Sequence, residues 1–475
     1  MVRTRFAPSP TGYLHVGGLR TALYAYLYAK QNDGQMILRI EDTDQERKVK
    51  GAIDKIIEAL DWAGLNPDEG PRAGGNYGPY IQSERIQYYT KYTNQLLEKE
   101  HAYPCFCTKE RLDELNRIQK MQNKPPGYDG KCRSIPKEEA EERIKEGEPH
   151  VIRQKIPEDR DIVVNDIIRG KVSFDTNLLD DQILVKSDGF PTYHLANIVD
   201  DHMMKITHVI RGEEWLPSTP KHILLYEFLG WNIPEFAHLP LLLNKDRSKL
   251  SKRQGDVAVS DYREKGYLKE ALLNFLALLG WNPGTEQEIF SMEELIKDFS
   301  LEKVGKSGSV FDVEKLNWMN GIYIRNLEIE ELYQQIKLMI ESEIDWDEKA
   351  LKKIVGLLQE SLTTLNDINE KGIIFFKEQL QLEEEAAEML QNENTVKVLR
   401  SFADKLKELE KLNKDNFIET ARAVQKETDI KGKQLWMGIR VGITGQTHGP
   451  EIHKTAEILG KKRSLNRIQE ALENA

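Results

Sequence analysis

Residues 3–18 read RTRFAPSPTGYLHVGG, and this stretch predicts how the fold begins. Arg3–Ala7 is a short β-like run, and the prolines of Pro8–Gly12 disfavour a helix in the residues before them. A helical pattern follows over about residues 15–31, and Met36–Ile40 is typical of a buried strand. This order predicts a βαβ unit and a parallel sheet, with ligands at the carboxyl ends of its strands.

The middle of the chain differs from this opening in composition and in its pattern of predicted elements. It contains all three cysteines, a charged helical pattern over Lys109–Asn123, and β-like runs at Asp161–Val164 and Gln182–Lys186. The parallel-sheet pattern resumes at Thr207–Arg211 and again at Ala237–Leu243. We therefore predict an insertion into an α/β domain.

The predicted fold class is an α/β parallel-sheet domain with an α+β insertion, followed by an all-α region, because the pattern is almost entirely helical from about Leu327. We expect the split sheet domain in residues 1–80 and 190–245, the insertion in 81–189, a connecting region in 246–325 and the helical region in 326–475, with candidate subdomains at about 326–375 and 376–475.

The composition excludes several classes of protein. With 475 residues, 39% of them hydrophobic and 31% charged, the chain is not a disordered, collagen-like or disulfide-stapled protein. It has no apolar signal-peptide core, and no run approaches the roughly 20 apolar residues that span a bilayer. We expect a reduced, soluble, cytoplasmic protein with no membrane partner. The net charge of −11, taken alone, argues against a nucleic-acid binder.

Two motifs point to a polyphosphate ligand. His15-Val16-Gly17-Gly18 opens the first predicted helix, whose unpaired N–H groups suit phosphates, and an imidazole there can donate to a phosphate oxygen. Residues 247–253 (RSKLSKR) hold four cations after a predicted strand, and ammonium groups stabilise charge on transferring phosphates. The alternatives are a histidine that only caps a helix and a solvated basic loop.

Together these motifs resemble the HIGH and KMSKS signatures of the class I aminoacyl-tRNA synthetases, here His15–Gly18 and Lys249–Arg253. The resemblance is greatest to the bacterial glutamyl-tRNA synthetases and covers essentially the whole chain. It is carried further by RFAPSPTG (5–12), RIEDTD (39–44), KSDGFPTYHLA (186–196), VIRGEEW (209–215) and WMNG (318–321).

The resemblance implies a Rossmann-type catalytic domain that activates L-glutamate with ATP and Mg²⁺ and then transfers it to the terminal adenosine of tRNA-Glu. It implies that residues 81–189 bind the tRNA acceptor end, that 246–325 contact the stem and carry the KMSKS-like loop, and that 326–475 bind the anticodon. A monomer is the family expectation. A pantetheine-phosphate-type nucleotidyltransferase and a decayed, non-enzymatic RNA-binding protein are the rival interpretations.

The resemblance also implies roles for individual residues. The catalytic residues would be His15, Lys249 and Lys252, with Lys252 stabilising the departing pyrophosphate. ATP would contact Pro8, Ser9, His15, Gly17, Gly18, Glu213, Trp215, Leu250, Ser251 and Lys252, with Glu214 nearby. Glutamate would contact Arg5, Ala7, Ser9, Glu41, Tyr193, Asn197 and Arg211, in which the arginines suit carboxylates because guanidinium groups bind them bidentately.

The three cysteines form a candidate metal site. Cys105 and Cys107 make a C-x-C pair with Cys132 further along, and three thiolates can bind tetrahedral zinc. Several family members place a further ligand two residues past the last cysteine, where this chain has Ser134, a poor zinc ligand. Tyr128 could complete the set, and the alternative is a group of reduced thiols without metal.

Two features bear on the tRNA. Gly356–Leu365, the stretch we align with the reader of the third anticodon base, has no arginine, which favours charging of tRNA-Gln as well as tRNA-Glu. Residues 326–393 carry 6 basic and 17 acidic side chains, whereas 394–475 carry 16 and 11. The locally basic end could therefore contact tRNA phosphates, or form a solvated face, through Lys431, Lys433, Arg440, Lys461, Lys462, Arg463 and Arg467.

Overall fold

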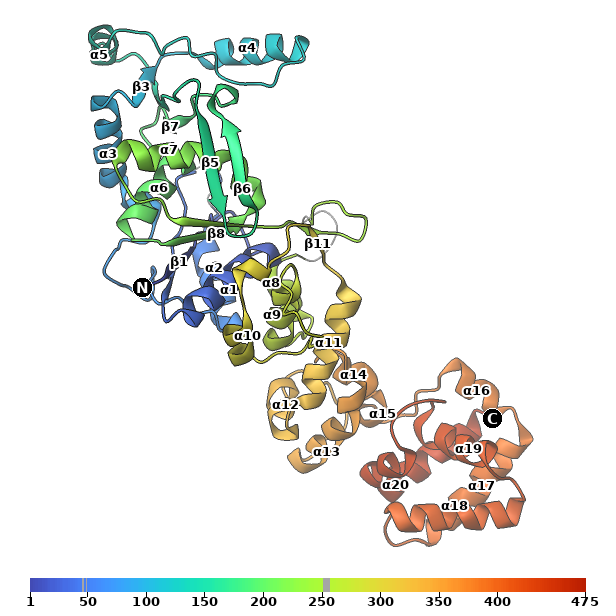
Figure 1. Cartoon of the computed structure of the whole chain (residues 1–475). Helices are drawn as coiled ribbons and strands as arrows, with labels where there is room; N and C mark the ends of the chain where they lie inside the picture. Colours follow the sequence, from blue (N-terminus) through green and yellow to red (C-terminus); the bar gives the residue numbers. More distant parts are fainter. Residues whose placement is uncertain (45–46, 48, 251–256) are drawn as a thin grey trace. The chain divides into compact units, whose positions relative to one another are not determined.

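The computed structural model describes residues 1–475 except 45, 46, 48 and 251–256, and the chain forms two compact units. Unit 1 comprises residues 1–262 and 272–312, and unit 2 comprises 263–271 and 313–475. Unit 1 is α/β and unit 2 is helical, so the predicted fold class is confirmed (Figure 1).

Unit 1 begins with the predicted βαβ unit. Strand β1 (Arg3–Phe6) pairs in parallel with β2 (Gln35–Leu38), and α1 (Val16–Gln31) connects them. One face of α1 is buried through Leu19 and Leu23, which matches the helical spacing of its apolar residues.

A second sheet contains the second half of the split domain. Strand β8 (His208–Gly212) runs parallel to β9 (Glu235–Leu239), and the Thr207 amide next to β8 donates to the carbonyl of Arg3 at 2.9 Å. Residues at the carboxyl ends of all four strands line a common cavity, and such strand ends are where ligands of parallel sheets bind.

The insertion has a small antiparallel sheet in the order β3 (Ala102–Cys105), β4 (Val151–Gln154) and β7 (Ile183–Val185). Strand β5 (Asp161–Asp166) lies between β6 (Gly170–Asp175) and β9 in the other sheet, although its sequence falls inside the predicted insertion. The reason is packing, because Ile162 and Val164 are buried in the core that contains Phe236 of β9.

The remaining elements of unit 1 surround these sheets. They are α2 (Ala52–Ala63), α3 (Ile86–Glu98), α4 (Lys109–Met121), α5 (Lys137–Lys145), α6 (Tyr193–Met203), α7 (Thr219–Leu229), α8 (Val259–Glu264), α9 (Lys269–Leu278), α10 (Met292–Asp298) and the parallel pair β10 (Leu242–Leu243) and β11 (Ser309–Val310), with α8 and α9 shared between the units.

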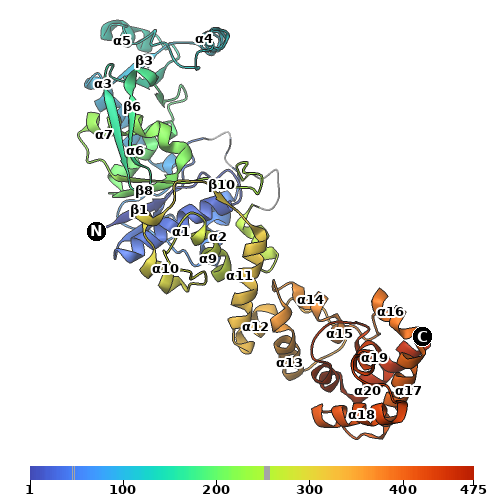
Figure 2. The same cartoon turned by 45° about the vertical axis from the view of Figure 1, so that its right-hand side comes forward.

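Unit 2 is a set of helices around one apolar core, seen from a second direction in Figure 2. The helices are α11 (Val313–Asn326), α12 (Ile329–Ile336), α13 (Glu348–Leu358), α14 (Asp367–Lys371), α15 (Ile373–Phe376), α16 (Glu384–Leu390), α17 (Glu393–Glu408), α18 (Lys414–Thr428), α19 (Lys433–Thr444) and α20 (Ile452–Glu473). Among the described residues of both units, no helix is long and apolar enough to cross a membrane.

One residue of the predicted basic face of unit 2 has a different role. Arg467 is only 2% exposed, and its guanidinium donates to the carbonyls of Ile374 at 2.6 Å and Lys377 at 2.7 Å. The prediction that Arg467 faces RNA phosphates is therefore wrong, because its charge is used to satisfy backbone carbonyls inside the fold. Lys431, Lys433 and Lys462 are exposed, as a phosphate-binding face requires.

Candidate active site

A cavity of about 1310 Å³ lies at the carboxyl ends of β1, β2, β8 and β9. Most of the predicted catalytic, glutamate-binding and ATP-binding residues line it, namely Arg5, Ala7, Ser9, His15, Gly17, Gly18, Glu41, Tyr193, Arg211, Trp215, Lys249 and Leu250. The folded chain therefore brings segments that are more than 200 residues apart to one place.

The N-terminus of α1 is one wall of this cavity. His15 caps the helix, and its Nδ1 accepts from the Gly17 amide at 2.9 Å. In the neutral ring the proton then lies on Nε2, while Nδ1 holds the helix end. Gly18 also packs closely, because a Cβ there would lie 2.9 Å from Leu14 Cδ1, so that the Leu14 side chain would have to move.

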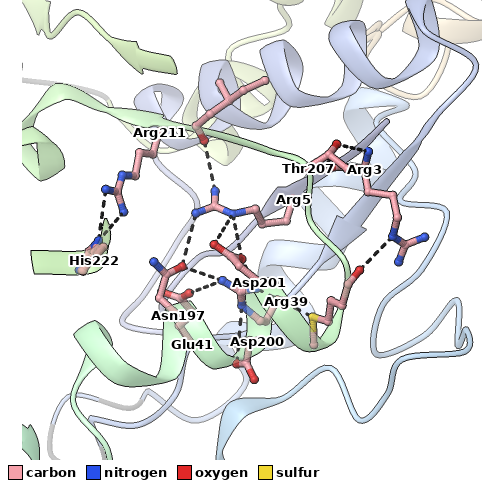
Figure 3. Close-up of polar contacts among 12 residues, drawn as sticks. Arg3, Arg5, Arg39, Glu41, Asn197, Asp200, Asp201, Thr207, Arg211 and His222 are labelled. Carbon is pink, nitrogen blue, oxygen red and sulfur yellow. Dashed lines mark hydrogen bonds and ion pairs between the residues drawn. The ribbon is translucent and has the colours of Figure 1, made fainter. Parts of the chain in front are cut away.

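A buried network of charges includes two residues that line the cavity, Arg5 and Glu41 (Figure 3). Arg39 donates to Asp201 at 2.6 Å, to Glu41 at 3.1 Å and to Asn197 at 2.9 Å. Arg5 shares Asp201 at 3.2 Å. All five side chains are less than 9% exposed, so the network is a fixed part of the fold.

The network changes the acidity of its carboxyl groups. Burial raises the pKa of Glu41, although the charges of Arg39 and Arg5 oppose that shift. Burial would also raise the pKa of Asp201, but Arg5 and Arg39 hold it below its usual value. Asp201 is therefore an anion that balances the two arginines. At Glu41, which lines the cavity, the arginine charges do not fully offset the effect of burial on the pKa.

Arg211 at the end of β8 has surroundings of another kind. It is 5% exposed and donates to Tyr193 Oη at 3.1 Å, to Thr219 Oγ1 at 2.9 Å and to His238 Nε2 at 3.0 Å. The rings of Tyr193 and Trp215 lie 4.1 Å apart between their centroids and form an aromatic wall beside it.

The KMSKS-like segment reaches the cavity through Lys249 and Leu250, and Lys249 Nζ lies 3.7 Å from a carboxylate oxygen of Glu214. Ser251 and Lys252 lie outside the described residues.

Three predicted contacts do not line the cavity, namely Pro8, Asn197 and Glu213. Glu213 accepts from the Leu241 amide at 3.0 Å and pairs with Arg169, and it is Glu214 that lines the cavity.

Sequence reasoning missed Arg39, Asp200 and Asp201 as supports of the site. Asp200 accepts from Arg85 at 2.6 Å and from Tyr89 at 2.8 Å. The available signal was a pair of acidic residues that directly follows the apolar pair Ile198-Val199 in α6, and buried acids are unusual unless cations face them.

The cysteine cluster is a separate site in the insertion. Cys107 Sγ lies 3.5 Å from Cys132 Sγ, and the three sulfur atoms all lie within 4.8 Å of one another. Tyr128 Oη lies 3.3 Å from Cys105 Sγ and 3.7 Å from Cys107 Sγ. Sulfur ligands of tetrahedral zinc lie about 3.8 Å apart for bonds of about 2.3 Å, so the spacing of the three thiols is close to that of such a site, and the phenol oxygen of Tyr128 lies beside them.

The comparisons with known proteins agree with this geometry. Residues 1–318 match the family model described as "tRNA synthetases class I (E and Q), catalytic domain", and residues 329–472 match an "Anticodon binding domain". The chain is thus a class I aminoacyl-tRNA synthetase, a ligase whose cavity lies at the carboxyl ends of a parallel sheet.

Similar proteins narrow that class. The chain is 50% identical to the glutamate–tRNA ligases of Alkaliphilus metalliredigens and Clostridioides difficile, over 98% of both chains in each case. A crystal structure of a glutamate tRNA ligase from Elizabethkingia meningosepticum in complex with its amino acid is 42% identical, with a TM-score of 0.93 over 99% of each chain. The chain belongs to the glutamate–tRNA ligase family.

Proposed function

We propose that the chain carries out the family reaction in the cavity of unit 1, first joining L-glutamate to the α-phosphate of ATP and then transferring it to the terminal adenosine of tRNA-Glu. The observation that supports this most is the cavity itself, which two arginines and a carboxylate line together with a helix N-terminus that carries His15. Glutamate, with two carboxylates and one ammonium group, and ATP, with a polyphosphate, match that arrangement of charges.

The glutamate side is assigned by charge. Arg5 and Arg211 bind the two carboxylates, and Glu41 accepts from the ammonium group. Ser9, Ala7 and Tyr193 supply further contacts along the wall, and Asn197 acts from below because its amide oxygen accepts from Arg5 and Arg39. The structure from Elizabethkingia meningosepticum, which holds its amino acid, supports a site for that ligand in this fold.

The ATP side is assigned by donors. His15 Nε2 and the amide of Gly18 bind phosphate oxygens, and Gly17, whose own amide donates to His15 Nδ1, lets the phosphates approach the backbone closely. Glu214, Trp215 and Leu250 line the nucleotide pocket, whereas Pro8 and Glu213 do not line the cavity. Mg²⁺ bound with ATP would add positive charge at the phosphates. Lys249, Ser251 and Lys252 complete this side by motif.

The chemistry then needs no nucleophile from the protein. An oxygen of the glutamate α-carboxylate attacks the α-phosphorus, and the bond to pyrophosphate breaks. In the second step a ribose hydroxyl of the terminal adenosine attacks the activated carbonyl, and AMP leaves with the bonding electron pair. The protein contributes the positioning of the reactants and the stabilisation of developing charge, which account for most of the catalysis in phosphoryl transfer.

The test is pyrophosphate exchange measured with tRNA present. We expect Lys252→Ala to lower adenylate formation by roughly 10²–10³-fold, the size of a lost transition-state donor. Lys171→Ala, which removes an exposed lysine of β6, is the matched control and should leave the rate unchanged. Exchange near wild type in Lys252→Ala would contradict the assignment.

The proposal extends to which tRNAs are charged, and to location and assembly. We propose that tRNA-Gln is also charged with glutamate, because Gly356–Leu365 has no arginine. Gln359, within this stretch, uses its side-chain amide inside the fold, where it donates to the carbonyls of Ile324 and Leu327 at 2.8 Å. Charging of both purified tRNAs decides this, and strict charging of tRNA-Glu would contradict it. A cytoplasmic monomer is the corresponding proposal for location and assembly.

The zinc site is the last part of the proposal. Cys105, Cys107, Cys132 and Tyr128 would hold the ion, and its function there would be to join β3 to the segment that follows α4. The same segment belongs to the proposed acceptor-binding insertion, so the ion would stabilise that insertion without taking part in the reaction.

A further inference from the structure

The two arginines proposed for glutamate differ in how their charge is compensated. Arg5 lies against Asp201, and the network with Arg39 and Glu41 brings further carboxylates near it. Arg211, by contrast, forms no ion pair with a carboxylate of any residue that the structure describes, and it contacts hydroxyl groups and imidazole rings instead. A buried cation of this kind is costly unless an anion arrives.

The first support of Arg211 is His238 on β9. Asp166 Oδ2 lies 2.6 Å from His238 Nδ1, and a carboxylate can only accept, so the ring proton lies on Nδ1. Nε2 is then an acceptor, and it receives the Nε–H of Arg211 at 3.0 Å. Burial lowers the pKa of His238 to about 4, so the ring is neutral at pH 7 despite Asp166.

Asp166 is itself held in place by backbone groups. Its Oδ1 accepts from the amides of Ile168 at 3.0 Å and Arg169 at 2.7 Å, in the turn between β5 and β6. Its Oδ2 accepts from the His238 amide at 3.1 Å as well as from the ring. The carboxylate is therefore fixed on one side by a turn and on the other by the histidine that it orients.

The second set of supports lies on α7. Thr219 Oγ1 donates to the carbonyl of Trp215 at 3.1 Å, which leaves its lone pairs for Arg211 Nη2 at 2.9 Å. His222 Nδ1 lies 3.4 Å from the same Nη2, and His222 Nε2 lies 3.0 Å from His194 Nδ1. Burial lowers the pKa of both histidines, so these acceptors are also uncharged.

We propose that Asp166 and His238, together with Thr219 and His222, are positioning residues that orient the Arg211 guanidinium without neutralising it, so that its full charge is available to a carboxylate of glutamate. Asp166 acts through the imidazole and sets its tautomer. A carboxylate in direct contact with Arg211 would compete with the substrate, whereas a neutral acceptor aligns the donor and leaves the charge. This inference rests on the proposed role of Arg211 in binding glutamate.

The test compares two substitutions of His238 in pyrophosphate exchange with tRNA present. His238→Leu removes the acceptor, and we expect KM for glutamate to rise by about 10- to 100-fold, the size of one misaligned charge-assisted hydrogen bond. KM for ATP should stay within about twofold. His238→Gln restores an acceptor oxygen near the place of Nε2, and KM for glutamate should return to within about fivefold of wild type.

Asp166→Asn tests the tautomer. An amide NH₂ facing Nδ1 moves the ring proton to Nε2, which then meets the Nε–H of Arg211 as donor against donor. We expect the same rise in KM for glutamate as in His238→Leu. Thr219→Val removes one acceptor at nearly constant volume and gives a second measurement if His238→Leu does not fold. His208→Gln is the matched control, since that histidine lies on β8 but not at the cavity.

The outcomes separate the inference from the proposed function. Unchanged KM for glutamate in His238→Leu, Asp166→Asn and Thr219→Val would overturn the inference, as would equal losses in His238→Leu and His238→Gln, or parallel losses in KM for ATP. The role of Arg211 itself is tested by Arg211→Gln, which should raise KM for glutamate and make a further His238→Leu change without effect. If Arg211→Gln binds glutamate normally, the carboxylate assignment fails, and the inference fails with it.

Discussion

The guanidinium of Arg39 lies 2.6 Å from the carboxylate of Asp201, and both side chains are almost completely closed to solvent. The two residues are 162 positions apart in the chain, and Arg39 directly follows β2 whereas Asp201 lies in α6. One ion pair thus joins the opening βαβ unit to the second half of the split domain, directly below the proposed glutamate site.

Breaking this pair should cost stability. We expect Asp201→Asn to lower the free energy of unfolding of unit 1 by about 3–5 kcal/mol, because Arg5 and Arg39 would then be buried cations that share too few carboxylates. Denaturant unfolding followed by fluorescence measures it. Asp54→Asn is the control, since its carboxylate is 70% exposed and pairs with Arg72, and we expect a change below about 1 kcal/mol. Equal changes in the two variants would contradict this account.

The two nitrogens of His15 can be tested separately. His15→Asn retains a side chain that caps α1 but has no donor at the place of Nε2, whereas His15→Ala loses both functions. We expect pyrophosphate exchange to fall by roughly 10²–10³-fold in both variants. Only His15→Ala should also lose about 1 kcal/mol of stability. A fully active His15→Asn variant would show that capping is the only function of this side chain.

Glutamate binding should weaken on the acid side at a higher pH than an ordinary carboxyl group predicts. Burial raises the pKa of Glu41 above 4.5, and the group must be ionised to accept from the substrate ammonium. The ratio kcat/KM for glutamate is therefore high above this pKa and falls as the pH decreases through it. Glu41→Gln should have low activity and no such limb. An acid limb at or below 4.5, or one retained in Glu41→Gln, would argue against this role.

Metal content tests the cysteine cluster. Protein purified without chelators should contain about one zinc per chain, and Cys107→Ser should lose most of it, because three ligands bind far more weakly than four. Ser134→Ala is the control and should retain the metal, since Ser134 is exposed and lies outside the cluster. Less than roughly 0.2 zinc per chain in the wild-type protein would contradict the site.

The features that could be predicted from the sequence are those with a local signal. The βαβ unit follows from the periodicity of residues 3–40, and the motifs at His15–Gly18 and Lys249–Leu250 mark segments that the structure places at one cavity. Both signals depend on neighbours in the chain, so a pattern of spacing is enough to find them.

The features that the sequence does not reveal depend on distant partners. Nothing near Asp166 in the sequence indicates that this carboxylate orients the ring of His238, which lies 72 residues later. Arg467 has the composition of a surface residue and is buried all the same, because three-dimensional packing supplies carbonyl acceptors that no sequence pattern encodes. Glu213 and Glu214 are neighbours of one type, and only the backbone direction decides which of them faces the cavity.

The path of β5 has a consequence for how this protein could be shortened or recombined. The strand lies within the stretch 81–189, yet it pairs with β9 and ends in Asp166 beside His238. If that whole stretch were excised, or exchanged for the insertion of a distant relative, the chain would lose the Asp166 carboxylate, which we propose orients the Arg211 guanidinium through His238. The segment that can be transplanted is therefore shorter than the inserted sequence, and its far end should be cut before residue 161, where β5 begins.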